Sequence, residues 1–167
     1  MTSNSKTRIS KNLDEKTILV SRVFNAPLAA VWRAYTESEI LDQWWGPEPW
    51  RSETKFMDFS EGGHWLYAMV GPDGTRHWAR MNYKAIVPQR IIEGEDGFCD
   101  ENGNLNPQLP VYQWVNQFTE TDGHTRVDHT LTFETLEGLQ TIVDMGFEQG
   151  ISIDLDQLEA LLAKNNL

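Results

Sequence analysis

The sequence predicts an α+β fold in which a curved antiparallel sheet wraps around a long C-terminal helix. Two observations carry this prediction. Between about residues 50 and 133, short strand patterns follow one another with no helical pattern between them, so the crossovers that a parallel sheet needs are absent. A helical pattern then follows towards the end of the chain. Because a sheet with one polar face must bury the other, we expect this helix to cover the inner face and to leave a largely apolar cavity beneath it.

The length of 167 residues suits a single domain. We expect this domain to span residues 16–167, in which we find neither an internal repeat nor a second domain. Residues 1–15 are low in hydrophobicity and rich in Ser, Thr, Asn and Lys, which is typical of a mobile tail. The predicted organisation is therefore a flexible N-terminal tail followed by one domain.

The first predicted elements are a strand and two short helices. Residues 18–24 alternate between two faces in the manner of a strand. Pro27 suits the first turn of a helix, and apolar residues at helical spacing continue from Leu28 to Tyr35. A second short helix is expected over residues 37–44, and Gly46-Pro47 ends it.

A hairpin follows a short strand over residues 50–56. Residues 64–70 and 76–85 both alternate, and Gly71-Pro72-Asp73-Gly74 between them is a turn signal. If Gly74 closes a three-residue loop, the apolar faces of the two strands agree. The predicted facing pairs are Trp65 with Met81, Tyr67 with Ala79, and Met69 with His77.

A second hairpin precedes the terminal helix. Residues 90–95 are expected to form a strand and residues 97–110 a polar loop. Strands over residues 112–118 and 127–133 then return across a two-residue Asp122-Gly123 turn. This register places Asn116 opposite His129.

From Thr135 the pattern becomes helical. A buried stripe is expected from Ile151 to Leu162, with Asp154, Asp156 and Glu159 among the outer positions. Asp144 and Glu148, four residues apart, would share one face of this helix and could form an acid and base pair if that face pointed inward. The simpler interpretation places both on the solvated side.

Charge and composition exclude two kinds of partner. The formal net charge of −11 opposes contact with a phosphate backbone, so nucleic acid is not expected. No segment approaches the about 20 consecutive apolar residues of a membrane helix, so no integral membrane contact is expected. The single cysteine, Cys99, cannot form an internal disulfide, and no signal-peptide core follows the polar start, which together favour the cytoplasm. Whether the protein is a monomer or a homodimer stays open.

Aromatic residues dominate the predicted inner face, and they favour a pocket for a small apolar molecule. Aromatic residues at this spacing also fill ordinary cores, so both interpretations stand. The residues that we expect to contact a ligand are Trp32, Trp65, Tyr67, Met69, His77, Met81, Tyr83, Trp114, Asn116, His129, Phe147 and Ile151.

Two histidines and a tyrosine are the candidates for catalysis. His77 and His129 are predicted to face inward with Tyr83, and an imidazole in a pocket can transfer protons near neutral pH. Alternatively, each imidazole only forms a hydrogen bond with a neighbour such as Asn116 or Tyr83. No carboxylate is clearly predicted on the same face.

Motifs for metals and cofactors fail on inspection. Asp100, Asn102, Asn104 and Asn106 imitate a calcium loop, but Leu105 replaces the glycine of the sharp turn and Val111 replaces the bidentate glutamate. Zinc-ligand spacing and a nucleophile elbow are also missing. We therefore expect neither a metal nor a cofactor.

Several segments together carry a resemblance to a known family: 23–27 with 31–32, 44–47, 62–63 with 69–74, 87–90, and 146–150 leading into 158–162. They resemble the START-like helix-grip superfamily (SRPBCC). Over residues 16–163, the chain is similar to the group of the C-terminal domain of the heat-shock-protein-90 ATPase activator (activator of Hsp90 ATPase homologue 1-like). The resemblance implies the helix-grip fold and a cavity for lipids, sterols, polyketides or other small apolar molecules.

Three functions follow as hypotheses. The first is a binding protein for a small apolar molecule, such as a lipid, polyketide or aromatic compound, held between the sheet and the terminal helix. The second is a cavity-based enzyme of the cyclase, dehydratase or hydrolase type that uses an inward histidine. The third is a chaperone-associated interaction protein, whose mark would be an exposed apolar patch.

Overall fold

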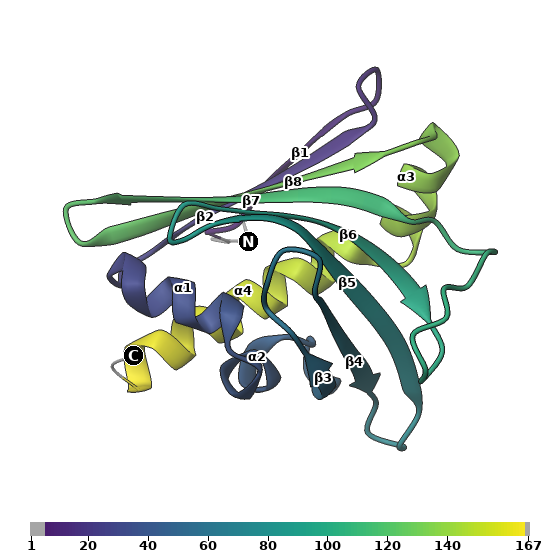
Figure 1. Ribbon diagram of the computed structural model, residues 1–167. Helices are drawn as coiled ribbons and strands as arrows, with labels where there is room; N and C mark the ends of the chain where they lie inside the picture. The colour runs from purple at the N-terminus through teal and green to yellow at the C-terminus, as the bar shows by residue number, and fades with distance from the viewer. Residues whose placement is uncertain (1–5, 166–167) are drawn as a thin grey trace, which may run out of the picture.

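The computed structural model describes residues 6–165, which form one eight-stranded antiparallel sheet and four helices (Figure 1). The strand order across the sheet is β1-β2-β8-β7-β6-β5-β4-β3. The elements are β1 (Arg8–Asn12), β2 (Thr17–Phe24), α1 (Leu28–Thr36), α2 (Ser38–Trp44), β3 (Arg51–Met57), β4 (His64–Val70), β5 (Arg76–Val87), β6 (Ile91–Cys99), β7 (Tyr112–Thr121), β8 (His124–Phe133), α3 (Leu136–Asp144) and α4 (Phe147–Asn165). The predicted α+β class, with two short helices and a long C-terminal helix, is confirmed.

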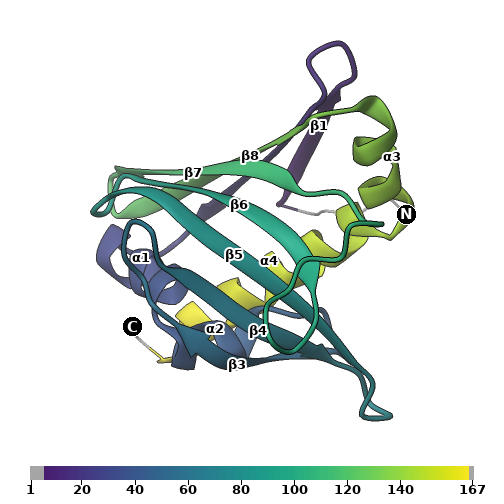
Figure 2. The same cartoon turned by 45° about the vertical axis from the view of Figure 1, so that its right-hand side comes forward.

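The sheet curves around α4, which runs along its concave side with α1 and α2 beside it (Figures 1 and 2). Alternation explains this arrangement, because one face of β2 is apolar and its Ile18 and Val20 are fully buried. Leu155 and Leu158 of α4 are also fully buried and belong to the same apolar cluster. Burying one such side chain contributes about 1.5–3 kcal/mol, so this cluster of sheet and helix residues forms the main core.

Both hairpins have the predicted register. Trp65 lies opposite Met81, and Met69 lies opposite His77. In the second hairpin, Asn116 lies opposite His129. The two-residue turn there has positive φ at Asp122 (53°) and Gly123 (78°), which suits the twist of a tight hairpin.

The start of the chain differs from the prediction of a mobile tail. Arg8–Asn12 forms β1 and pairs with β2 along its whole length, so the tail prediction is wrong for these residues. The polar composition of these residues explains the error. An edge strand is held by backbone pairing and needs few apolar side chains, so its sequence can look like that of a tail. Residues 1–5 of the predicted tail lie outside the described residues.

The helical region after Thr135 is divided into α3 and α4. Gly146 adopts a left-handed φ of 91°, which ends α3 and lets α4 start in a new direction. Asp144 and Glu148 therefore lie on different helices, and the prediction that they share a face is wrong. Asp144 accepts a hydrogen bond from Gln140, and Glu148 pairs with Lys11 of β1.

No helix between residues 6 and 165 is long and apolar enough to cross a membrane.

Candidate functional site

A cavity of about 200 Å³ lies between the concave face of the sheet and the first half of α4. The sheet supplies most of its wall, from β4 to β8. The segment from α1 to the loop after α2 supplies Tyr35, Leu41, Trp45 and Pro47, and α4 supplies Phe147, Gly150, Ile151 and Asp154.

Cross-strand pairing explains why the sheet residues of the cavity lie side by side. One row runs across the inner face with a single residue from each strand: Trp65, Met81, Asp96, Tyr112 and Phe133 are successive partners. All but Phe133 line the cavity. A backbone register therefore places one carboxyl group among aromatic and thioether side chains.

A second row crosses the cavity through Tyr83, Gly94, Trp114 and Leu131. Gly94 leaves the space that the Trp114 ring occupies. A Cβ atom at residue 94 would lie 2.9 Å from that ring and 2.5 Å from the carbonyl oxygen of Asn82. Glycine at this position thus allows the indole to lie flat on the sheet and to form part of the cavity wall.

Asp96 is the carboxylate that the sequence analysis did not find. It lines the cavity, and Trp114 Nε1 donates to its Oδ1 over 2.5 Å. Burial raises the pKa of Asp96 to about 8, because an ionised carboxylate is poorly solvated there; hydrogen bonds from Trp114 and Tyr112 oppose this rise. At pH 7 most of this carboxyl group is therefore protonated.

The signal for Asp96 was present in the sequence but was overridden. Asp96 has the same parity as the buried Ile92 and Gly94. The polar composition that begins at Gly97 led to a strand ending at residue 95, whereas β6 continues to Cys99. Extending the alternation by one residue would have placed the carboxyl group on the inner face.

Asp154 adds a second carboxyl group from the opposite wall. It is 4% exposed and lines the cavity, and its Oδ1 accepts a hydrogen bond from the Gly46 backbone over 3.2 Å. Burial raises its pKa well above the ordinary range. The expectation that Asp154 occupies an outer position is wrong, because it lies three residues after Ile151 and four before Leu158, in line with the buried stripe.

His129 takes part in a buried chain of neutral hydrogen bonds. Its Nδ1 lies 2.7 Å from Asn116 Oδ1, and its Nε2 lies 3.1 Å from the Tyr35 hydroxyl. Burial lowers the pKa of His129 to about 4, so the ring is neutral at pH 7. A neutral ring donates through Nδ1 to the amide oxygen and accepts at Nε2 from the tyrosine, so both ring nitrogens are engaged.

Eight of the predicted ligand contacts line the cavity. They are Trp65, Met81, Tyr83, Trp114, Asn116, His129, Phe147 and Ile151. The inward direction of the two hairpins accounts for most of them.

The other four predicted contacts lie elsewhere. His77 is exposed and lies against the Trp50 ring, because β4 and β5 extend past the cavity towards their turn. Its predicted inward position is therefore wrong. Tyr67 is buried, stacks on Trp65 at 4.1 Å and accepts a hydrogen bond from Trp45. The remaining two, Trp32 and Met69, are half-buried in the surrounding core.

The sequence did not predict the third wall of the cavity, which the segment from α1 to the loop after α2 forms. The helices after β2 were predicted, but their contact with α4 depends on the tertiary fold. Tyr35 and Trp45 belong to this wall, and so does Pro47, whose ring faces Gly150 of α4. Within residues 6–165, no group of three or more His, Cys, Asp or Glu side chains is arranged to hold a metal ion.

Comparison with known proteins identifies relatives of this architecture. A model of the family described as "Activator of Hsp90 ATPase homolog 1-like protein" matches residues 25–163. Protein Ms6760 from Mycobacterium smegmatis has a similar crystal structure, with 35% identity, a TM-score of 0.87, and coverage of 93% of this chain and 96% of that one. A comparison with curated proteins gave no match.

Two solution structures are also similar. The protein from Arthrobacter aurescens is 29% identical with a TM-score of 0.89, and the alignment covers 94% of this chain and 91% of the other. The protein from Staphylococcus epidermidis is 31% identical with a TM-score of 0.82 and coverage of 93% for both chains. The chain belongs to the activator of Hsp90 ATPase homologue 1-like family, as the resemblance in its sequence indicated.

Proposed function

We propose that this member of the activator of Hsp90 ATPase homologue 1-like family binds a small, largely apolar molecule in the cavity between its sheet and α4. One observation carries the proposal: about 200 Å³ of space lies beside a core in which Leu155, Leu158 and many other side chains are fully buried. Concave sites that are mostly apolar and carry a few polar groups are the usual binding places for small molecules.

The size of the cavity narrows the class of ligand. A cavity of about 150 Å³ is enough for benzene, whereas sites for drug-sized ligands occupy about 300–1,000 Å³. At about 200 Å³, the present cavity matches a compound with one or two rings. Among the classes predicted from the sequence, this volume favours an aromatic compound over a lipid, a sterol or a large polyketide.

A binding screen with a matched pair of variants tests the proposal. Ile151 lines the cavity, whereas Ile153 on the same helix is 40% exposed. One-ring and two-ring compounds should raise the melting temperature of the wild type and of Ile153→Trp. They should leave Ile151→Trp unchanged, because the indole fills the cavity. Native mass spectrometry would identify any compound that copurifies. Equal binding to both variants, or no binding to the wild type, would refute the proposal.

For an enzymatic function, Asp96 is a better candidate than the histidines that the sequence suggested. His77 is exposed and does not line the cavity, and both ring nitrogens of His129 already form hydrogen bonds, so the proposed histidine mechanism is weakened. Asp96 is better suited, because a carboxyl group with a pKa of about 8 can donate or accept a proton near neutral pH. Conversion of a cavity-bound compound by the wild type, lost in Asp96→Asn while binding persists, would favour this alternative.

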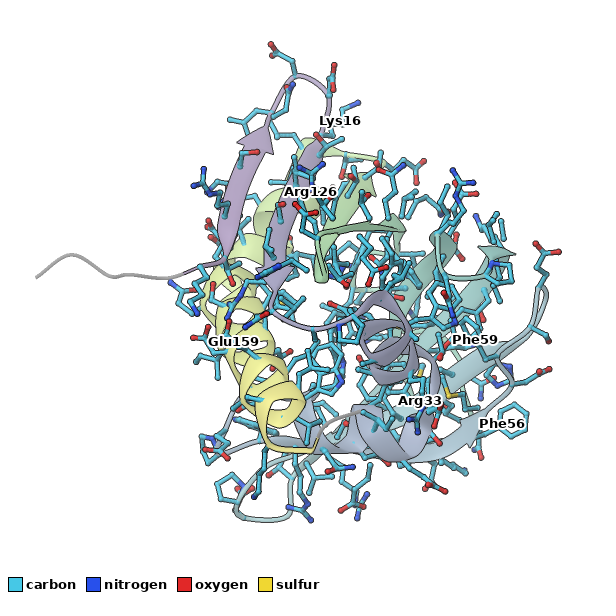
Figure 3. All side chains as sticks on the ribbon, turned by 90° about the vertical axis from the view of Figure 1, so that its left-hand side faces the viewer. Lys16, Arg33, Phe56, Phe59, Arg126 and Glu159 are labelled. Atoms are coloured by element: carbon cyan, nitrogen blue, oxygen red, sulfur yellow. The ribbon has the colours of Figure 1, made fainter. Side chains whose placement is uncertain are left out.

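The third hypothesis, a chaperone-associated interaction protein, has no specific support in the described surface. Large exposed apolar residues occur on several separate elements, including Val23 of β2, Phe56 of β3 and Ile153 of α4. Phe56 projects outward at the edge strand in Figure 3. Scattered apolar residues of this kind are normal on protein surfaces.

A further inference from the structure

We propose that the cavity selects a small organic cation, a protonated amine on a body of one or two rings, that Asp96 contacts its nitrogen, and that Asp154 adds negative charge from the opposite wall. This inference rests on the proposed function, because it names the ligand class for the same cavity. It goes further by assigning a charge to the ligand and a role to two carboxyl groups.

The titratable side chains of the cavity are unbalanced in charge. Asp96 lies on β6 and Asp154 on α4, so the two carboxyl groups come from opposite walls. No Lys or Arg lines the cavity. Neither carboxyl group takes part in any ion pair within the described part of the chain. A buried carboxyl group is normally paired with a cation or a metal, or is neutralised by protonation, and here the protein supplies no cationic partner.

The two carboxyl groups use only part of their capacity to accept hydrogen bonds. An ionised carboxylate can accept about four hydrogen bonds through its two oxygens. Asp154 accepts one, from the Gly46 backbone. Asp96 accepts from the Trp114 indole and interacts with the Tyr112 hydroxyl. Both carboxyl groups therefore retain acceptor capacity for the N–H groups of a ligand, and an ammonium group offers three such donors.

Aromatic side chains surround the same space as the two carboxyl groups. Trp45, Trp65 and Trp114 line the same cavity, together with Tyr83 and Phe147. An aromatic face attracts a cation through its quadrupole, and indole attracts it most strongly. The same rings supply apolar contact for the body of the ligand. An organic anion would instead meet two carboxyl groups and no basic side chain.

Proton linkage gives the proposal a measurable signature. Burial raises the pKa of Asp96 to about 8, so this carboxyl group is mostly protonated in the free cavity at pH 7. Burial also raises the pKa of Asp154 well above its ordinary range. An ammonium ion favours the ionised form and would lower both pKa values. Binding of the cation should therefore release protons from the protein.

The other titratable groups of the cavity do not give the same signature. Tyr35 of α1 and Tyr83 of β5 have pKa values raised by burial, and so does Tyr112 of β7. His129 of β8 has a pKa of about 4. All four are neutral between pH 6 and 9, which leaves the two carboxyl groups as the source of the protons.

Calorimetry with three one-ring probes tests the inference: 2-phenylethylamine as cation, 2-phenylethanol as neutral analogue and phenylacetate as anion. At pH 7, we expect the amine to bind at least about tenfold more tightly than the alcohol, since charge-assisted hydrogen bonds exceed neutral ones, and we expect no binding of phenylacetate. Titrations in buffers with different ionisation enthalpies should show that the amine releases protons and that the alcohol does not.

Conservative variants locate the effect. Asp96→Asn and Asp154→Asn should each weaken binding of the amine by about tenfold and change binding of the alcohol by less than about threefold. Asp144→Asn, on the exposed side of α3, is the matched control and should behave as wild type. The ratio of amine to alcohol affinity in the wild type decides the matter even if one variant fails to fold.

The outcomes separate this inference from the proposed function. Equal or tighter binding of 2-phenylethanol overturns the inference while the cavity remains a binding site. Binding of phenylacetate does the same and points to a different recognition chemistry. If none of the three probes binds, the inference fails, and the wider screen of one-ring and two-ring compounds decides on the proposed function independently.

Discussion

Buried charge is handled differently in two regions of the molecule. Between β2 and α4, Arg22 is 1% exposed, and its Nη1 lies 2.8 Å from Asp156 Oδ1 while its Nη2 lies 3.5 Å from Glu159. Figure 3 shows Glu159 on α4 below β1 and β2. In the cavity, Asp96 and Asp154 have no such partner. In the first region the fold itself supplies acidic partners for the cation, although Arg22 Nε and Nη2 form no hydrogen bond within the described residues. In the second region it supplies no cation, which is the role proposed above for a ligand.

The largest effect is expected at Arg22. Arg22→Ala should lower the free energy of unfolding by about 2–5 kcal/mol, because truncating a fully buried side chain leaves a cavity. Loss of the cation adds little, because the Asp156 side chain is 61% exposed and that of Glu159 is 34% exposed. Arg126, an exposed residue paired with Asp128, is the control, and Arg126→Ala should cost less than about 1 kcal/mol. Urea denaturation measures both, and similar values for the two variants would contradict the structural role of Arg22.

Replacing Asp96, the unpaired carboxyl group, should raise stability, whereas replacing Arg22 should lower it. The folded pKa of Asp96 is about 8, and the unfolded value is about 3.9, so the folded state prefers the proton. Its stabilising contribution is fully present below pH 4 and is lost as the pH rises towards 8. Asp96→Asn should therefore become more stable than the wild type as the pH rises, by about 2 kcal/mol at pH 8, since partial exposure of Asp96 reduces the full linkage effect.

Urea denaturation of wild type and Asp96→Asn at pH 5, 6.5 and 8 measures that gain. A difference independent of pH would show that the carboxyl group is ionised throughout, and the contrast with Arg22 would then disappear.

Breaking the hydrogen bonds of the neutral His129 ring should lower stability by an intermediate amount. His129→Leu removes the partner of both Tyr35 and Asn116. The buried hydroxyl and amide then lose their hydrogen bonds, and stability should fall by about 1–3 kcal/mol. Thermal denaturation at pH 7 measures the loss. Val127→Ala on the same strand controls for lost apolar volume, because Val127 is fully buried but carries no polar atom.

The smallest effect is expected at an exposed ion pair. Lys11 Nζ lies 3.1 Å from Glu148, and both side chains are about one-third exposed. Lys11→Ala should change stability by less than about 0.5 kcal/mol, and salt should reduce even that difference. A larger loss in the same urea experiment would show that this contact holds β1 on α4 more strongly than a surface pair can.

Alternation made the fold predictable from the sequence. Polar and apolar residues alternate clearly in β5, β7 and β8, and the turn residues fix the pairing, so the register of Trp65 with Met81 followed directly. β1 escaped detection because only Ile9 among its five residues is half-buried, the others being exposed. The break at Gly146 was missed because helical spacing is similar on both sides of it.

The candidate site was only partly predictable, for a physical reason. Apolar and aromatic lining follows from parity, whereas acidic residues such as Asp96 and Asp154 are normally assigned to solvent because burying them is unfavourable. A functional site is where this preference is violated. For this reason, a prediction that assigns acidic residues to solvent failed at Asp96 and Asp154.

The cross-strand row from Trp65 to Phe133 has a consequence for how such cavities diversify. Each position in the row belongs to a different strand, and the backbone pairing that aligns them does not depend on side-chain identity. One substitution can therefore alter the chemistry of the wall while its neighbours keep their places. Proteins that share this backbone can therefore acquire new ligand preferences one substitution at a time, and each intermediate variant still folds.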